Sequence, residues 1–316
     1  MTINTLKHSG LSPTRIAFGC EPLGGSDWGK FDIAEVRRAV QTALDEGITV
    51  FDTADVYGLG QSELELGKAL GKKRHSAFII TKFGVAWKKE SYKRAITYKK
   101  ASASYIRQAL ENSLKRLRIE AIPLYFLHWP DPETPINETL EELEKFRIEG
   151  KILNYGISNF EAQTIKNTKM IFNLKAVQNN YNLLECEESR GIFDIAETLG
   201  LVRFAYGPLA QGLLTGKYNQ NTRFHLDDRR HRLSKFSSAQ WSKNQKVLKA
   251  LNFVAKRRAK SVAQIAIRWV LQSGKVDIVV TGAKSSEQLK NNIDVLEWSL
   301  NDQDIEILNN VIMKNK

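Results

Sequence analysis

Short apolar segments alternate with amphipathic segments along most of the chain. The short segments are apolar on both faces, which is typical of strands in a parallel sheet that helices cover on the outside. They predict eight strands, at Arg15–Gly19, Thr49–Asp52, Ala77–Thr81, Pro123–Leu127, Asn154–Ile157, Ala176–Gln178, Leu201–Phe204 and Asp277–Val280.

The amphipathic segments between these strands predict helices. In residues 33–46, Val36, Val40 and Leu44 recur close to the helical period. Similar spacing predicts helices at Ser104–Leu117, Asn137–Glu149, Ser189–Gly200 and Ser261–Leu271, and two C-terminal helices near Glu287–Val295 and Asn301–Ile312.

Eight strands alternating with helices over about 250 residues predict a (β/α)8 barrel of the α/β class. A doubly wound open sheet is the rival, but "FGCEPLGGSDWG" after the first strand lacks the glycine spacing of a dinucleotide fingerprint. A turn-like Ser9–Gly10 within the first 14 residues predicts an N-terminal β-hairpin at the barrel floor. Because no linker, repeat or low-complexity tract interrupts the pattern, we expect one domain, residues 1–316.

The composition is that of an ordinary globular protein, with 42% hydrophobic and 26% charged residues among 316. No apolar run approaches the roughly 20 residues that span a bilayer, and the N-terminus lacks the apolar core of a secretory signal. Cys20 and Cys186 are too few for a disulfide framework or a cysteine-rich metal site. We therefore expect a cytoplasmic protein without a membrane partner or a bound metal.

The net charge of +12 fits a solvated basic surface, an anionic small molecule or nucleic acid. Seven lysines and arginines lie in Lys82–Lys100 against one acid, and this segment lacks strand or helix periodicity, so it is predicted to be a loop. A second basic cluster, "RRHR", covers Arg229–Arg232. Neither cluster lies in a nucleic-acid-binding motif, so we expect no nucleic-acid partner and consider a phosphate-bearing ligand instead.

Polar side chains follow three consecutive predicted strands. Asp52 ends the second strand and Tyr57 follows in its loop, within "GITVFDTADVYG"; Lys82 ends the third strand and His128 the fourth. In a barrel the carboxyl ends of the strands meet at one rim, where functional groups lie. A buried strand that runs into a lysine is costly unless the lysine is paired, so packing alone does not explain this pattern.

The chemistry of these four residues, the tetrad, is complementary. A nearby ammonium is expected to lower the pKa of a tyrosine, a carboxylate would pair with that ammonium, and a histidine can orient a carbonyl. Together they predict a proton donor for a carbonyl oxygen. None of the four can supply a hydride, so a cofactor is required.

Several motifs resemble the aldo-keto reductase superfamily, in order over nearly the whole chain: "FDTADVYG", "TKFG", "LHWPDP", "GISNF", "VQNNYNLL", "YGPLAQGLLTGKY" and "GAKSSEQLKNNI". The chain is most similar to the bacterial branch of general stress and inositol-cluster reductases. The resemblance implies a (β/α)8 barrel that uses NADPH or NADH without metal. It implies Tyr57 as general acid, Lys82 and Asp52 as its tuning pair, and His128 as the group that orients the carbonyl.

The same resemblance implies the cofactor site. Ser158, Asn159 and Gln178 would hold the nicotinamide carboxamide, and Tyr206 would stack on its ring. The loop that would cover the pyrophosphate contains Pro208, Leu209, Gln211, Gly212 and Lys217. The segment for the adenosine 2′-phosphate and adenine contains Gly282, Ala283, Lys284, Gln288, Asn291 and Asn292.

Some positions depart from the family pattern. Lys284 stands where relatives often have an arginine, and a lysine neutralises a phosphate without the bidentate grip, so NADP(H) is favoured while NAD(H) stays open. Glu21 stands where a small or hydroxyl residue is commoner; it either faces the pocket or lies in solvent at the rim. Trp28, Trp87 and Trp129, with Phe236, are candidates for the substrate pocket.

These observations predict an NADP(H)-dependent oxidoreductase that reduces an aldehyde, ketone or keto-sugar to an alcohol. The substrate would be a small carbonyl compound, sugar-like or anionic. Two alternatives stay open: a cofactor-binding regulatory subunit with little turnover, and physiological oxidation of a sugar alcohol. The sequence does not indicate an oligomeric state.

Overall fold

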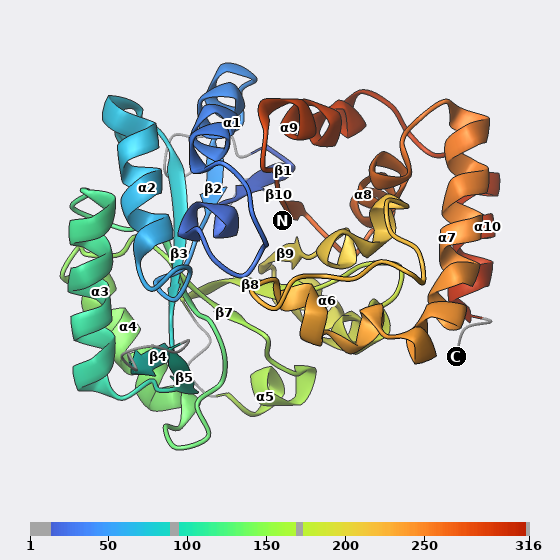
Figure 1. The fold of residues 1–316 in the computed structure, drawn as a ribbon. Helices are drawn as coiled ribbons and strands as arrows, with labels where there is room; N and C mark the ends of the chain where they lie inside the picture. The colour runs from blue at the N-terminus through green and yellow to red at the C-terminus, as the bar shows by residue number, and fades with distance from the viewer. Residues whose placement is uncertain (1–13, 89–94, 169–172, 314–316) are drawn as a thin grey trace.

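The computed structural model describes residues 14–88, 95–168 and 173–313. The hairpin predicted from the first 14 residues lies outside the described residues, which begin at Thr14. Eight parallel strands close into a barrel in the order β1-β10-β9-β8-β7-β6-β3-β2 (Figure 1). The strands are β1 Ile16–Gly19, β2 Val50–Asp52, β3 Phe78–Phe83, β6 Leu124–Leu127, β7 Tyr155–Ser158, β8 Leu174–Asn180, β9 Val202–Tyr206 and β10 Ile278–Gly282.

Each barrel strand overlaps a predicted strand, so the predicted (β/α)8 barrel is confirmed. Figure 1 shows the helices around the barrel, with α1, α2 and α3 packed in sequence along one flank and α7 against α10. The helices are α1 Ile33–Asp45, α2 Gln61–Leu70, α3 Ala103–Leu117, α4 Ile136–Ile148, α5 Ala162–Asn167, α6 Glu187–Thr198, α7 Ser238–Arg258, α8 Val262–Gln272, α9 Ser286–Ile293 and α10 Asp302–Met313. Shorter 3₁₀ segments are η2 Glu21–Gly24, η3 Gly71–His75, η4 Ala210–Thr215, η5 Arg229–Arg232, η6 Ser234–Phe236 and η7 Asp294–Glu297.

The helices α2, α5 and α7 were not predicted, whereas those expected from apolar spacing are present, including the two C-terminal helices. The apolar positions of α7, such as Trp241, Leu251 and Val254, are buried but separated by many lysines, arginines and polar residues. The packing of α7 against α8 and α10 therefore stabilises a helix that the local pattern indicates only weakly.

The prediction that Lys82–Lys100 is a loop is wrong. β4 Val85–Lys88 and β5 Ile96–Lys99 form an antiparallel hairpin after β3, in which Val85 pairs with Lys99 and Trp87 with Thr97. All four β5 residues are exposed, so no buried face imposes an alternating pattern. Backbone pairing between the strands, which the residue pattern does not encode, decides the structure here.

Side-chain alternation along the strands determines which residues enter the barrel. Val50, Ile80 and Phe126 belong to the cluster that fills its interior. Because alternate residues of a strand share a face, the side chains two positions further along also face inward, at the carboxyl end of the barrel. This places Asp52 on β2, Lys82 on β3 and His128 after β6 at the same rim.

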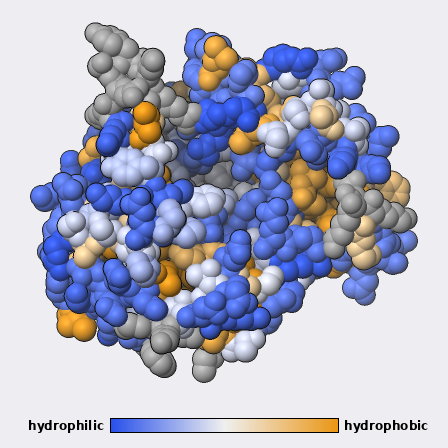
Figure 2. Space-filling view, turned by 90° about the horizontal axis from the view of Figure 1, so that it is seen from below, coloured by the Kyte–Doolittle hydropathy of each residue, from blue (hydrophilic) through white to orange (hydrophobic). Residues whose placement is uncertain are grey.

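Within the described residues, no helix is long and apolar enough to cross a membrane, and no three histidine, cysteine or acidic side chains gather as they do around a metal ion. Cys20 and Cys186 are buried free thiols. Figure 2 shows a largely hydrophilic face with separate hydrophobic patches.

Candidate active site

Asp52 and Lys82 form a buried ion pair at the carboxyl end of β2 and β3. The Lys82 Nζ lies 2.6 Å from the Asp52 Oδ1 and also donates to the Thr53 carbonyl at 2.8 Å. The Gln178 amide donates to the Asp52 Oδ2 at 2.8 Å, and the two paired side chains are only 1% and 4% exposed. A charge buried this deeply needs such partners, and here each charge has its counter-ion and further hydrogen bonds.

Tyr57 and His128 lie beside this pair. The Lys82 Nζ is 5.4 Å from the centre of the Tyr57 ring, and the His128 ring meets the Tyr57 ring edge-on with 5.8 Å between centroids. The tetrad predicted from three strand ends is therefore one cluster in space.

A close backbone contact positions the Tyr57 loop. Gly58 has φ +58°, and a Cβ there would lie 2.1 Å from the Gly24 carbonyl oxygen of η2. Only glycine fits a left-handed residue in such contact with another backbone. The loop after β2 thus packs directly on the loop after β1, which fixes where Tyr57 projects.

The pKa of Tyr57 differs from the expectation. Desolvation raises the pKa of Tyr57 well above its usual value, and the charges of Glu21 and Asp52 raise it further, against an opposing effect of Arg229. The predicted lowering by a nearby ammonium is therefore wrong for this structure. The Lys82 charge is already paired with Asp52, so burial dominates. The phenol stays protonated at neutral pH, as a proton donor must.

His128 is held in its neutral form. Burial lowers the pKa of His128 well below its usual value, and the charges of Lys82, Lys99 and Arg229 act in the same direction. Its carbonyl oxygen accepts a hydrogen bond from the Asn159 amide at 2.9 Å. The buried Nδ1 has no partner in the part of the chain that the structure describes. A neutral imidazole has one N–H donor, which suits orienting a carbonyl oxygen.

Glu21 lies in an ion pair rather than free in solvent. Its carboxylate lies 2.7 Å from Arg229 of η5, and its side chain is 23% exposed. Arg229 also lies 3.5 Å from Asp27, so two carboxylates share it. Sequence reasoning treated Arg229 only as part of a basic cluster. Its proximity to the tetrad depends on a contact between segments 202 residues apart, which no local motif reveals.

The residues predicted to hold the nicotinamide lie at the ends of β7, β8 and β9. Ser158 is buried, and Asn159 follows it with φ +64°. The Tyr206 hydroxyl donates to the Asn159 Oδ1 at 2.6 Å. The side chain of Gln178 is engaged with Asp52, so it connects this group to the tetrad. These amide and hydroxyl groups can hydrogen-bond to a carboxamide, and the Tyr206 ring can stack on the ring that carries it.

The predicted pyrophosphate loop turns sharply after β9. Gln211 and Gly212 both have positive φ within η4, at 55° and 92°. The buried Gln211 Oε1 has no hydrogen-bond partner among the described residues. Pro208 and Leu209 precede this turn, and Lys217 follows it at an exposed position. The loop thus contains one buried polar atom that no described residue satisfies.

The predicted adenosine segment joins β10 to α9. The Gln288 side chain accepts from the Lys284 N–H at 2.9 Å, and the Asn292 amide donates to Thr281 at 3.2 Å, which shapes the turn through Gly282 and Ala283. A Cβ on Gly19 would lie 3.1 Å from the Gly282 nitrogen, so the backbones of β1 and β10 lie in close contact here. The Asn291 side chain instead contacts Ser261 of the α8 cap. These residues fit a phosphate-bearing nucleotide, with Lys284 as its cation.

The three candidate tryptophans lie on the segments that follow β1, β3 and β6. Trp28, after β1, contacts Arg229 and Lys284, whose charged groups lie 5.2 and 5.7 Å from its ring centre. Trp87 is on β4, and Trp129 follows His128 and is 38% exposed. Phe236 packs against Tyr218 and Phe224 in a separate aromatic cluster.

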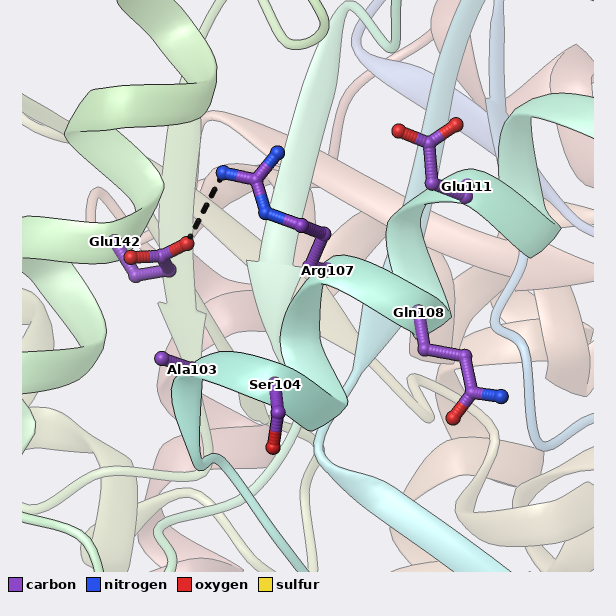
Figure 3. Close-up of a pocket in the computed structure, with 6 residues that line it drawn as sticks. All are labelled: Ala103, Ser104, Arg107, Gln108, Glu111 and Glu142. Carbon is purple, nitrogen blue, oxygen red and sulfur yellow. Dashed lines mark hydrogen bonds and ion pairs between the residues drawn. The ribbon is translucent and has the colours of Figure 1, made fainter.

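A shallow hollow of about 610 Å³ lies elsewhere, between α3 and α4. Figure 3 shows Arg107 of α3 reaching across it to Glu142 of α4. Its lining comes from helices on the outside of the barrel, with none of the residues at the strand ends. The functional groups therefore belong to the barrel rim and not to this hollow.

A closed parallel barrel with a buried Asp–Lys pair, a protonated tyrosine and a neutral histidine at its carboxyl rim defines an acid–base site of the barrel oxidoreductases. Comparison with known proteins agrees: the model of the aldo/keto reductase family matches residues 15–312. The chain belongs to the aldo/keto reductase family. Members of this family reduce carbonyl compounds with nicotinamide cofactors, so the chain is a nicotinamide-dependent oxidoreductase.

Individual relatives cover nearly the whole chain. Aldo-keto reductase YhdN of Bacillus subtilis (strain 168) is 34% identical over 99% of this chain and 94% of its own. The NADP(+) aldo-keto reductase yakc of Schizosaccharomyces pombe is 30% identical over 96% of this chain and 89% of its own. The structure of a glycerol dehydrogenase from Gluconobacter oxydans superimposes with a TM-score of 0.87 and 37% identity, covering 96% of this chain and 93% of its own.

Proposed function

We propose that this protein reduces an aldehyde, ketone or keto-sugar to the alcohol with NADP(H), and that Tyr57 is the proton donor. One observation carries the proposal. The Tyr57 ring, whose phenol stays protonated, lies 5.4 Å from the Lys82 ammonium and 5.8 Å from the neutral His128 ring at the carboxyl rim of the barrel.

Each tetrad residue has a distinct task in this reaction. A nicotinamide held by Ser158, Asn159 and Tyr206 would supply the hydride. Tyr57 gives its proton to the carbonyl oxygen, and the nearby Lys82 ammonium stabilises the phenolate that forms. Asp52 fixes the position of Lys82 through their 2.6 Å ion pair. His128 orients the carbonyl oxygen with its single N–H donor.

The preference for NADP(H) rests on Lys284 at the end of β10. It is the cation of the segment assigned to the adenosine 2′-phosphate, and its ammonium donates to the Trp28 carbonyl at 2.7 Å. The relative from Schizosaccharomyces pombe carries NADP(+) in its name, which supports the same preference.

Oxidation of a polyol is a second candidate, because the same residues can run the reaction in reverse and one structural relative is a glycerol dehydrogenase. Tyr57 would then accept the proton of the alcohol. Equilibrium and cofactor ratio decide the direction, so the tetrad chemistry serves both candidates.

The variant Tyr57→Phe tests the proton-donor role. It should lower kcat for a reactive aldehyde by about 10²- to 10⁴-fold, the usual contribution of general acid catalysis. Binding of NADPH, followed by quenching of protein fluorescence, should be unchanged because the phenol hydroxyl is not assigned to the cofactor. Steady-state kinetics with NADPH and with NADH measure the effect.

Tyr125→Phe is the matched control. Tyr125 lies on β6 with a buried hydroxyl that has no partner among the described residues, so its loss should leave kcat within about twofold. Full turnover by Tyr57→Phe would refute the proposed mechanism.

A further inference from the structure

The hairpin β4–β5 places a lysine beside the tetrad. The Lys99 Nζ lies 4.2 Å from the ring centre of Trp129, the residue after His128. Its charge is close enough to help lower the pKa of His128. A cation this close to an aromatic face is held by the ring quadrupole, which fixes its position without neutralising it.

Lys99 differs from the other cations near His128. Lys82 has Asp52 as its counter-ion, and Arg229 has both Glu21 and Asp27. Among residues 14–88, 95–168 and 173–313, no carboxylate pairs with Lys99. Lys99 is exposed to solvent over much of its side chain, yet desolvation by the surrounding protein lowers the pKa of Lys99 to about 8. At neutral pH the group is therefore still mostly an ammonium, with no carboxylate partner among the described residues.

The position of Lys99 favours a substrate over the cofactor as its counter-ion. The hairpin follows β3, next to β2 and β6, which carry the rest of the tetrad. The residues assigned to the cofactor follow β7, β8, β9 and β10 on the other part of the barrel. A molecule whose carbonyl lies at Tyr57 and His128 would extend over Trp129 toward Lys99.

We propose that Lys99 is a specificity-determining residue, and that it binds the carboxylate or phosphate of an anionic carbonyl substrate whose chain lies along Trp129. This inference rests on the proposed carbonyl reduction at the tetrad and names its substrate class. Lys99 takes no part in the bond changes; it supplies a positive charge that no carboxylate of the described residues neutralises.

Two substrate pairs, matched within each pair except for the anionic group, test the proposal. They are 4-carboxybenzaldehyde against 4-formylbenzamide, and glyceraldehyde 3-phosphate against glyceraldehyde. In Lys99→Met the ratio of kcat/KM, anionic over neutral, should fall by about tenfold in one pair or both, mainly through KM. Lys99→Glu should lower the ratio further, and Lys99→Arg should retain most of it. The pair that responds identifies carboxylate or phosphate as the group bound.

Lys88→Met is the matched control. Lys88 lies on β4 of the same hairpin, and its ammonium is 5.9 Å from the ring centre of Tyr98, in an analogous contact. In Lys88→Met the ratio of kcat/KM, anionic over neutral substrate, should stay within about twofold of the wild-type ratio, because a distant exposed charge is screened. An equal fall in Lys88→Met, or no fall in Lys99→Met for either pair, would overturn the proposal.

A binding measurement separates this inference from the proposed function. Calorimetry with terephthalate and NADP⁺ needs no turnover, and Lys99→Met should weaken terephthalate binding by about tenfold. If the wild type reduces none of the four aldehydes, the proposed function fails, while calorimetry still decides whether Lys99 binds an anion. If the wild type reduces the aldehydes without any response to Lys99, only the inference about Lys99 fails.

Discussion

At the scale of single residues, the site depends on charges that are buried together. Lys82 and Asp52 are each almost fully buried, so each is tolerable only because the other is present. The strand ends predicted which residues meet. They did not predict the direction of the Tyr57 pKa shift, because desolvation and two carboxylates outweigh an ammonium that is already paired.

Removing one member of this pair should cost more stability than removing both. Asp52→Asn leaves the Lys82 charge buried without its carboxylate and should lower the free energy of unfolding by about 3–5 kcal/mol. The double variant Asp52→Asn/Lys82→Met should regain a large part of that loss. Urea denaturation of the wild type, both single variants and the double variant measures the coupling. Additive losses in the double variant would show that the pair is not coupled in this way.

At the scale of elements, two loops hold each other in place. η2 after β1 and the loop after β2 contact each other through Gly24 and Gly58, where even one methyl group would collide with backbone. Each loop restricts the position of the other, and Tyr57 lies next to this contact. A conformational constraint between loops therefore positions the proposed proton donor.

Gly58→Ala should disturb both stability and catalysis. Its Cβ would add a backbone collision to the left-handed strain, so we expect a loss of about 2–4 kcal/mol in unfolding free energy and a lower kcat. Gly47→Ala is the control, because Gly47 also has a positive φ, +79°, but nothing lies within 4 Å of its added Cβ. It should cost only about 1–2 kcal/mol and leave kcat unchanged. Thermal unfolding and steady-state kinetics of both variants test this, and equal losses would contradict the argument.

At the scale of the whole molecule, contacts between distant segments cross the barrel rim. Asp27 and Trp28 after β1 bridge to Asp228, and the Arg229 and Arg230 side chains lie over the Trp28 ring. Lys284, which follows β10 near the other end of the chain, donates a hydrogen bond to the Trp28 carbonyl. Three parts of the chain thus meet beside the site assigned to the cofactor.

This arrangement predicts a pH-dependent cofactor preference. Burial and the Arg230 charge, against Asp228, lower the pKa of Lys284 to about 8 from 10.5. Below pH 8 the ammonium is present before NADPH binds. Above pH 8 binding must take up a proton, so the Kd for NADPH should rise by up to about tenfold per pH unit toward the usual lysine value. The Kd for NADH should not respond to this group.

Lys284→Met should remove that pH dependence and raise the Kd for NADPH by about tenfold or more at pH 7. Lys290→Met is the control, because Lys290 lies on α9 nearby but pairs with Glu46 on the surface. Fluorescence titrations with NADPH and NADH between pH 6.5 and 9.5 measure both effects. An NADPH affinity in Lys284→Met equal to the wild type would exclude Lys284 as the ligand of the 2′-phosphate.

The sequence by itself determined the barrel and the convergence of the tetrad. The strands are apolar on both faces, so the sequence alone did not set which side chains face inward. Parallel strands bring their carboxyl ends to one rim, however, so Asp52, Lys82 and His128 were expected to meet there. The sequence does not determine the hairpin that carries Lys99, the pairing of Glu21 with Arg229, or the contact of Lys284 with Trp28. These contacts involve exposed or irregular segments, where no buried face imposes a pattern, so only the tertiary structure decides which charges are paired.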